Sequence, residues 1–126
     1  MRILCFTVFI LFFIAVPIYG QEYGAATNAT ELKVLRLINS LPEVQRENKF
    51  RRLHKNPRLL KALIQSTPTK ENNYYQVSIS EDLGFQLRTY EWYEVDAKTF
   101  TIKYFDVASG KSMTLSEKRK LNKKKQ

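Results

Sequence analysis

The sequence predicts an α+β fold in which helices come first and antiparallel strands follow. From Leu32 to Leu41 apolar residues recur at helical spacing, and from Tyr74 they alternate with polar residues instead. Alternation is typical of strands with one buried face. Helices followed by a run of strands with short loops indicate an antiparallel sheet with helix on one face. We expect an N-terminal helix, kinked or split in two, packed on a sheet of about four strands.

The first 20 residues have the pattern of a cleavable secretory signal peptide. Arg2 supplies a positive charge, the stretch that follows to Pro17 is uncharged, and Gly20 is a small residue suited to precede a cleavage site. The alternative is a membrane anchor, for which the apolar run lies at the lower limit of length. We expect cleavage between Gly20 and Gln21 and export to the periplasm or the extracellular space, between which the sequence does not decide.

Composition divides the chain into four segments: a signal peptide (1–20), a disordered linker (21–30), a single α+β domain (31–116) and a basic tail (117–126). The one cysteine, Cys5, lies in the signal peptide. The mature chain is therefore expected to have no disulfide, which favours a bacterial envelope protein, and no thiol catalysis or cysteine-bound zinc.

The charge balance is basic, at +9 for the whole chain and +8 without the signal peptide, whose only charged residue is Arg2. The tail alone contributes six positive charges and one negative. We expect it to be solvated and frayed, with at most weak electrostatic contact with anionic lipids or glycans. An exported protein seldom meets nucleic acid, so no nucleic-acid partner is expected.

Two helix starts can be read from local signals. Asn28 and Glu31 are three residues apart, as in a capping pair. Ser40 precedes Pro42 and Glu43, which predicts a serine-capped second helix over about 41–54, separate from the first or continuous with it through a kink.

The spacing on this second helix predicts which residues face the core. Val44, Phe50 and Leu53 are expected to face inward, whereas Arg51 is expected to face water along with the other charged residues. The apolar run over 59–65 fits either a buried strand or a helix turn, and we expect a strand.

Alternation predicts strands near 74–79, 87–95 and 100–105, and Met113 and Leu115 suggest a last short strand. The strand at 87–95 has blurred alternation, which indicates two covered faces or a bulge. The expected core comprises Leu35, Ile38, Val77, Ile79, Tyr93, Val95 and Ile102.

Five short motifs occur in order: Leu41-Pro42-Glu43-Val44, Tyr74-Tyr75-Gln76-Val77, Glu81-Asp82-Leu83-Gly84, Val95-Asp96-Ala97-Lys98-Thr99 and Ile102-Lys103-Tyr104-Phe105-Asp106. Over roughly residues 34 to 117 the chain thereby resembles a group of small, uncharacterised exported proteins of Bacteroidetes. The resemblance implies a cystatin-like or PepSY-like fold, with a helix cradled by an antiparallel sheet. The chain departs from the group at Ser80 and Phe100, turn positions where the group has glycine. The resemblance implies no catalytic residue.

Aromatic residues on neighbouring predicted strands form the candidate binding site: Tyr74, Tyr90, Trp92 and Tyr104. Exposed aromatics anchor interfaces and stack on sugars or peptides. Cross-strand pairing that stabilises a sheet is the alternative for the same residues and is favoured over a binding face.

Other polar residues carry weaker signals. His54 is the only histidine, and the neighbouring cations disfavour a catalytic or metal-binding role because they repel a metal ion. Glu81 and Asp82 lack the spacing of a calcium loop and are expected in a turn. We assign no catalytic residue, no metal site and no cofactor.

These observations lead to a monomeric, non-catalytic secreted or periplasmic binding module whose partner is an unknown envelope protein, peptide or glycan. One alternative is an enzyme or small-ligand pocket on a cystatin-related or nuclear-transport-factor-like cone fold, which needs a deep pocket with a converging acid and base. The other is a surface-adhering protein that acts through its basic tail.

Overall fold

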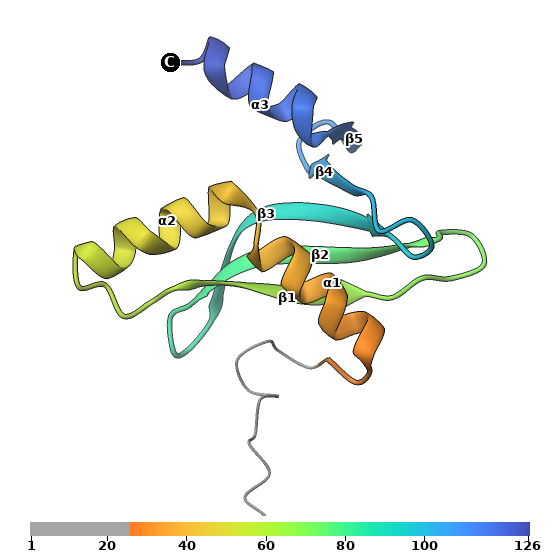
Figure 1. The fold of residues 1–126 in the computed structure, drawn as a ribbon, viewed down its shortest axis with the longest axis horizontal. Coiled ribbons are helices and arrows are strands. Elements are labelled where there is room, and N and C mark those ends of the chain that lie inside the picture. The colour runs from red at the N-terminus through yellow and green to blue at the C-terminus, as the bar shows by residue number, and fades with distance from the viewer. Residues whose placement is uncertain (1–25) are drawn as a thin grey trace, which may run out of the picture.

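The computed structural model describes residues 26–126, which form three helices and an antiparallel five-stranded sheet (Figure 1). The elements are α1 (Ala29–Asn39), α2 (Pro42–Leu53), β1 (Leu60–Ser66), β2 (Tyr74–Asp82), β3 (Leu87–Asp96), β4 (Ile102–Asp106), β5 (Lys111–Thr114) and α3 (Leu115–Lys124). The predicted signal peptide and residues 21–25 of the predicted linker lie outside the described residues. Within 26–126, no helix has both the length and the apolar character needed to span a membrane.

The sheet is a simple meander in which each strand pairs with the next, in the order β1-β2-β3-β4-β5. The predicted strand over 59–65 is confirmed as β1, and β5 is the short strand suggested near Met113. The sheet therefore has five strands rather than four. Phe100, in the β3–β4 connection, has φ 58°, a left-handed conformation in which glycine is favoured.

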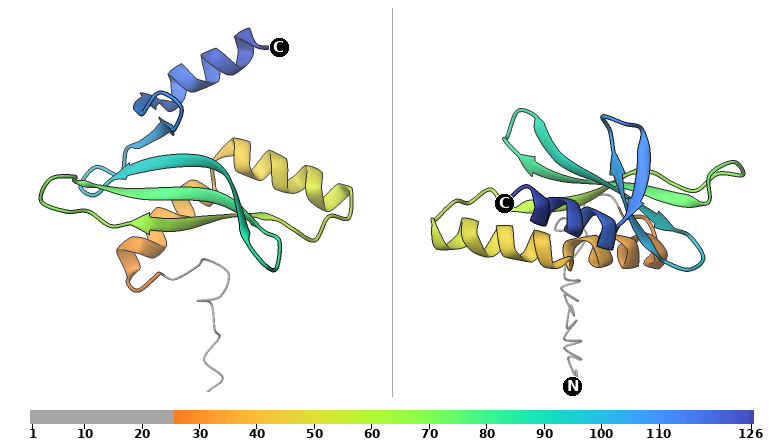
Figure 2. Two further views of the ribbon diagram at one scale, coloured as in Figure 1. Left: turned by 180° about the vertical axis from the view of Figure 1, so that it is seen from behind. Right: turned by 90° about the horizontal axis from the view of Figure 1, so that it is seen from above.

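The core lies between the sheet and the helices α1 and α2, which are on one side of it (Figure 2). Val34, Leu35 and Ile38 of α1 belong to the same buried cluster as Val77 and Val95 of the central strands. Among the residues predicted for the core, all are buried except Ile102, which is only partly buried near the edge of the sheet.

The start of α1 is confirmed, because the side chain of Asn28 accepts a hydrogen bond from the backbone N–H of Glu31. Helix α1 begins at Ala29, so the last two residues of the predicted linker are helical. The expected serine cap of α2 is wrong: the N-cap residue is Leu41, without a side-chain hydrogen bond, and Ser40 instead ends α1. Pro42 occupies the first turn of α2, as expected.

The predicted faces of α2 are confirmed for Val44, which is buried, but are wrong for Phe50, Leu53 and Arg51. Phe50 and Leu53 are 56% and 72% exposed, whereas Arg51 is 8% and Asn48 7% exposed. Asn48 binds the backbone of Leu60 twice, since its Nδ2 donates to the carbonyl oxygen at 3.0 Å and its Oδ1 accepts from the N–H at 2.7 Å. Arg51 donates to the Arg58 carbonyl at 2.7 Å. The buried backbone groups of Leu60 at the start of β1 need partners, so Asn48 of α2 faces inward.

The basic tail is not frayed. Residues 115–124 form α3, which begins with a capping box: the Thr114 hydroxyl accepts from the Glu117 N–H, and the Glu117 carboxylate accepts from the Thr114 N–H. Thr114 and Glu117 have the spacing of a capping box, so this helix start was readable in the sequence but was missed. None of the residues of α3 is buried.

Candidate binding cleft

The four aromatic residues predicted to form one binding face lie on two faces of the sheet. Tyr104 pairs in register with Tyr93, which also pairs with the core residue Val77, so Tyr104 is on the helix-covered side. Trp92 pairs with Ser78 and Phe105 and therefore points to the opposite side. The prediction of a single aromatic face is wrong, because successive residues of a strand point to opposite faces of the sheet and a shift of one residue moves a side chain to the other face.

The other two members are also separated. Tyr74 precedes the buried Tyr75 and lies on the outer side with Trp92. Tyr90 is the extra residue of a bulge, because Ile79 pairs with Glu91 while the next residue of β2 pairs with Thr89. This bulge confirms one explanation of the blurred alternation in the strand, and it brings Tyr90 to the helix side.

A hollow of about 290 Å³ lies beside Tyr74 on the outer face, between Glu94, Asp96 and Lys103. Backbone N–H groups of Thr99 and Lys98 donate to Asp96 and hold the pKa of its carboxyl below the usual value. Asp96 thus stabilises the β3–β4 turn, and the hollow is open and largely polar.

A second candidate site is a cleft of about 380 Å³ between α2, β3 and α3, which we call the α2–α3 cleft. Its floor is apolar and is made by Val44, Leu60, Ile79 and Tyr93. Its rim is charged and comprises Glu43, Glu47, Arg51, Glu91 and Lys118. Tyr90 and Asn122 complete the lining.

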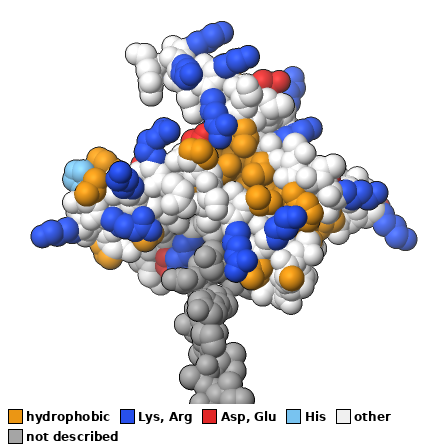
Figure 3. All heavy atoms as spheres, in the orientation of Figure 1, with side chains coloured by type: hydrophobic (Ala, Val, Ile, Leu, Met, Phe, Trp, Pro, Cys, Tyr) orange, Lys and Arg blue, Asp and Glu red, His pale blue; other side chains and the backbone are white. Residues whose placement is uncertain are grey.

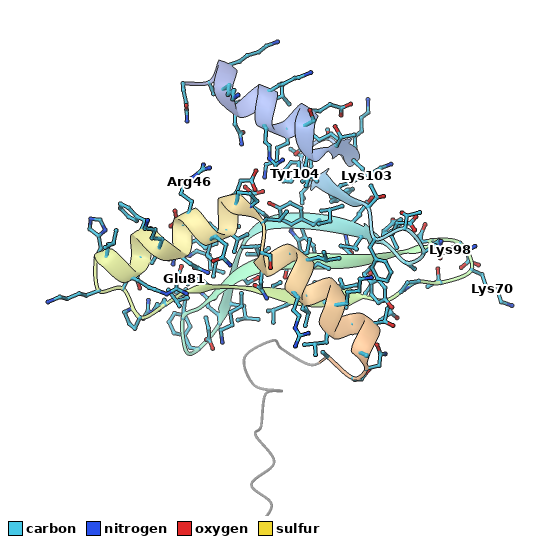
Figure 4. All side chains as sticks on the ribbon, viewed as in Figure 1. Arg46, Lys70, Glu81, Lys98, Lys103 and Tyr104 are labelled. Atoms are coloured by element: carbon cyan, nitrogen blue, oxygen red, sulfur yellow. The ribbon has the colours of Figure 1, made fainter. Side chains whose placement is uncertain are left out.

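Two carboxylates at the mouth of the cleft are occupied by cations of α3. Arg119 Nε donates to Glu43 Oε1 at 2.5 Å, and this hydrogen bond lowers the pKa of Glu43. Lys118 pairs with Glu91, and its Nζ lies 3.7 Å from the centre of the Tyr104 ring. Figure 4 shows Tyr104 at the foot of α3, where the side chains of that helix reach the sheet.

The site that holds the Lys118 ammonium is therefore a cation cage. Glu91 supplies the charge, and the rings of Tyr104 and Tyr93, at 3.7 and 5.4 Å from Nζ, supply aromatic faces. Tyr93 is only 2% exposed, and burial raises the pKa of its hydroxyl well above the usual value, so it stays neutral. The cage is suited to bind a cation rather than to transfer a proton.

The wall of the cleft is built on a buried ion pair. Glu81, which was expected in a turn, belongs to β2 and is 6% exposed; its Oε1 lies 3.1 Å from Arg51 Nη1. The Tyr90 hydroxyl donates to Glu81 Oε2 at 2.6 Å, and Figure 4 shows Glu81 beneath α2. This hydrogen bond first, and Arg51 second, lower the pKa of Glu81. No local pattern identifies these partners, which come from three different elements.

The lowered pKa of Glu81 predicts an acid-dependent loss of stability. A depressed carboxyl pKa contributes stability that is complete above the unfolded-state pKa and lost as the pH falls through the folded-state pKa. We expect the melting temperature of the wild type to fall more steeply between about pH 5 and about pH 3 than that of Glu81→Gln, with the two curves converging in acid. Parallel curves in a thermal melt series would contradict this role.

Other candidate groups are placed away from the cleft. His54 is exposed at the end of α2, and its ring stacks on Phe50 with centroids 4.0 Å apart. Asp82 accepts from the Gly84 N–H at 2.8 Å in the β2–β3 turn. Within residues 26–126, no cluster of three histidine, cysteine or carboxylate side chains is arranged to hold a metal ion.

The α2–α3 cleft thus combines an apolar floor with a charged rim whose three carboxylates are paired with Arg51, Lys118 and Arg119. Such a site can accommodate an apolar body and bind a positive group at its mouth. Comparison with family models, curated proteins and solved structures finds no match to this chain.

Proposed function

We propose that this protein is an exported, non-catalytic binding module with a cystatin-like arrangement, whose α2–α3 cleft binds a lysine- or arginine-bearing apolar peptide segment of an envelope partner. One observation carries the proposal: Glu43 and Glu91 at the mouth of the cleft already hold cationic side chains, Arg119 and Lys118. A partner's basic side chain would take the place of one of them.

The size and lining of the cleft support this kind of ligand. A volume of about 380 Å³ is within the range of small-ligand sites, which extends from about 300 to 1,000 Å³. The apolar floor offers burial to a Leu, Ile or Phe side chain, worth about 1.5–3 kcal/mol when complete. The aromatic rings of Tyr93 and Tyr104 favour a cation over a neutral polar group.

The alternative of a catalytic pocket has less support from the lining residues. An acid–base pair works best when its pKa values lie near the working pH. Arg119 lowers the pKa of Glu43, and burial raises that of Tyr93, so both shifts move away from neutrality. Export itself rests on the signal-peptide pattern of residues 1–20 and on the resemblance to exported proteins of Bacteroidetes.

Titration calorimetry with short apolar peptides tests the proposal. The probes are peptides with one central lysine and the same peptides with glutamine in its place. We expect the lysine peptides to bind and the Glu43→Gln/Glu91→Gln variant to bind them at least about tenfold more weakly, because charged hydrogen bonds are lost. The matched control is Glu94→Gln, which removes a carboxylate of β3 beside the hollow on the outer face.

Removing the cations of α3 instead of the carboxylates should have the opposite effect on peptide affinity. Lys118→Ala/Arg119→Ala frees Glu91 and Glu43 from their internal partners, so we expect tighter peptide binding. The proposal would be overturned if neither double variant changed the affinity for the lysine peptides, or if the glutamine peptides bound with the same affinity as the lysine peptides.

A further inference from the structure

The outer face of α2 combines exposed apolar side chains with uncompensated positive charge. Phe50 and Leu53 are 56% and 72% exposed, as noted above. Arg46, Lys49 and Arg52 are also exposed. Lys49, Phe50 and Leu53 follow Arg46 by three, four and seven residues. This spacing places all four along one stripe of the helix. We call this stripe the α2 outer face.

The fold does not require these two apolar side chains. Asn48 and Arg51 attach the inner face of α2 to the start of β1, and Val44 fills the core. Apart from the stacking of His54 on Phe50, the large side chains of Phe50 and Leu53 face solvent. Large apolar groups gathered on an exposed face mark a surface that makes contact with something else.

The charges on α2 indicate what that contact is. Its two acidic residues, Glu43 and Glu47, are engaged by Arg119 and Arg51. The basic residues of the outer face have no such partners among the ion pairs of residues 26–126. The space-filling view shows Lys and Arg side chains spread over α2 and α3 on this side, with few acidic ones (Figure 3). Figure 4 shows Arg46 projecting from α2 away from the sheet.

We propose that the α2 outer face docks on an anionic lipid surface. Phe50 and Leu53 enter the boundary between headgroups and acyl chains, while Arg46, Lys49 and Arg52 meet the lipid phosphates. Apolar side chains beside basic ones on an exposed helix face offer two contacts that an interfacial helix makes with a membrane, apolar burial and attraction to anionic headgroups. Figure 1 shows the C-terminal end of α2 at the margin of the molecule, where a flat surface can reach it.

This docking uses residues of α2 that do not line the α2–α3 cleft. It also differs from adhesion through the basic tail, which involves charge alone. Each basic residue near an anionic surface adds electrostatic attraction that salt screens, and the apolar side chains add affinity that salt does not screen. Binding should therefore weaken with salt but not disappear.

Co-sedimentation with phosphatidylcholine vesicles, with and without phosphatidylglycerol, tests the docking. The protein is the chain from Gln21, which retains the whole core described above. We expect binding to the anionic vesicles only, weaker by at least about tenfold in Phe50→Ser/Leu53→Ser. Arg46→Gln/Lys49→Gln should bind at least about fivefold more weakly.

Two substitutions elsewhere provide matched controls. Val107→Ser removes an apolar side chain that is 63% exposed in the β4–β5 turn, and Lys98→Gln removes an exposed charge in the β3–β4 turn. Both should bind like the wild type. Thermal melts should be unchanged in all four variants, because the altered side chains face solvent.

A spectroscopic readout reports insertion directly. In Phe50→Trp, the fluorescence of the new tryptophan should shift to the blue when anionic vesicles are added, relative to the wild type, whose single tryptophan is Trp92. Three results would overturn the proposal: wild-type binding by Phe50→Ser/Leu53→Ser, no blue shift, or binding abolished only by deletion of residues 117–126. No vesicle binding at low salt would also overturn it and would favour a protein partner.

Discussion

Replacing Val77 by aspartate is expected to lower the free energy of unfolding by at least about 4 kcal/mol, which is enough to unfold many single domains. Val77 is 0% exposed on the central strand β2, opposite Ile64 of β1 and Tyr93 of β3. A carboxylate at this position loses its water without gaining a partner, and the protein must protonate it, hydrate it or unfold.

Chemical denaturation followed by circular dichroism measures this effect. The comparison variant is Gln76→Asp, one residue away but on the outer side of β2, where Gln76 is only partly buried. Gln76→Asp should lower the free energy of unfolding by about 1 kcal/mol, mainly because the new carboxylate faces the carboxylate of Glu94 on β3. Equal losses at the two positions would show that the strand faces are wrongly assigned.

Removing the amide of Asn48 is expected to lower the free energy of unfolding by about 2–5 kcal/mol, because this one side chain makes two buried hydrogen bonds. In Asn48→Ala the backbone N–H and C=O of Leu60 lose their partner, and Leu60 is itself buried. The loss should be local as well as global, since α2 is then held to the start of β1 mainly by Arg51.

Amide hydrogen exchange tests the local part, and denaturation tests the global part. The Leu60 amide should exchange faster in Asn48→Ala, whereas Asn39→Ala, which removes one hydrogen bond to the Ala62 N–H, should cost about half as much. A protected Leu60 amide together with a loss below about 0.5 kcal/mol would mean that water or another residue replaces Asn48.

The candidate sites show where sequence reasoning stops. The aromatic residues were correctly identified as neighbours on strands, but the bulge at Tyr90 and the register of β3 divided them between two faces. The α2–α3 cleft was not predicted. Its mouth depends on the pair Glu43–Arg119, which is 76 residues apart in the chain, and no local spacing reveals such a contact.

The sequence by itself determined the features that depend on local chemistry. The capping of α1 by Asn28 follows from hydrogen bonds three residues apart, and the strand pattern from Tyr74 follows from a period of two. Tyr93 and Val95 were correctly placed in the core, because successive side chains of a strand point to opposite faces and the apolar ones indicate the buried face.

Only the tertiary structure decided the orientation of α2 and the position of α3. Apolar spacing favoured Phe50 and Leu53 as inward residues, but Asn48 faces inward to bond the backbone of Leu60, and Arg51 faces inward to pair with Glu81. The sequence of α3 contains its charges and a capping-box spacing, whereas the binding of Arg119 and Lys118 to Glu43 and Glu91 depends on where the sheet ends. Which polar residues distant in sequence become partners depends on the fold, because a buried hydrogen-bonding group is stable only where a partner lies within hydrogen-bond distance.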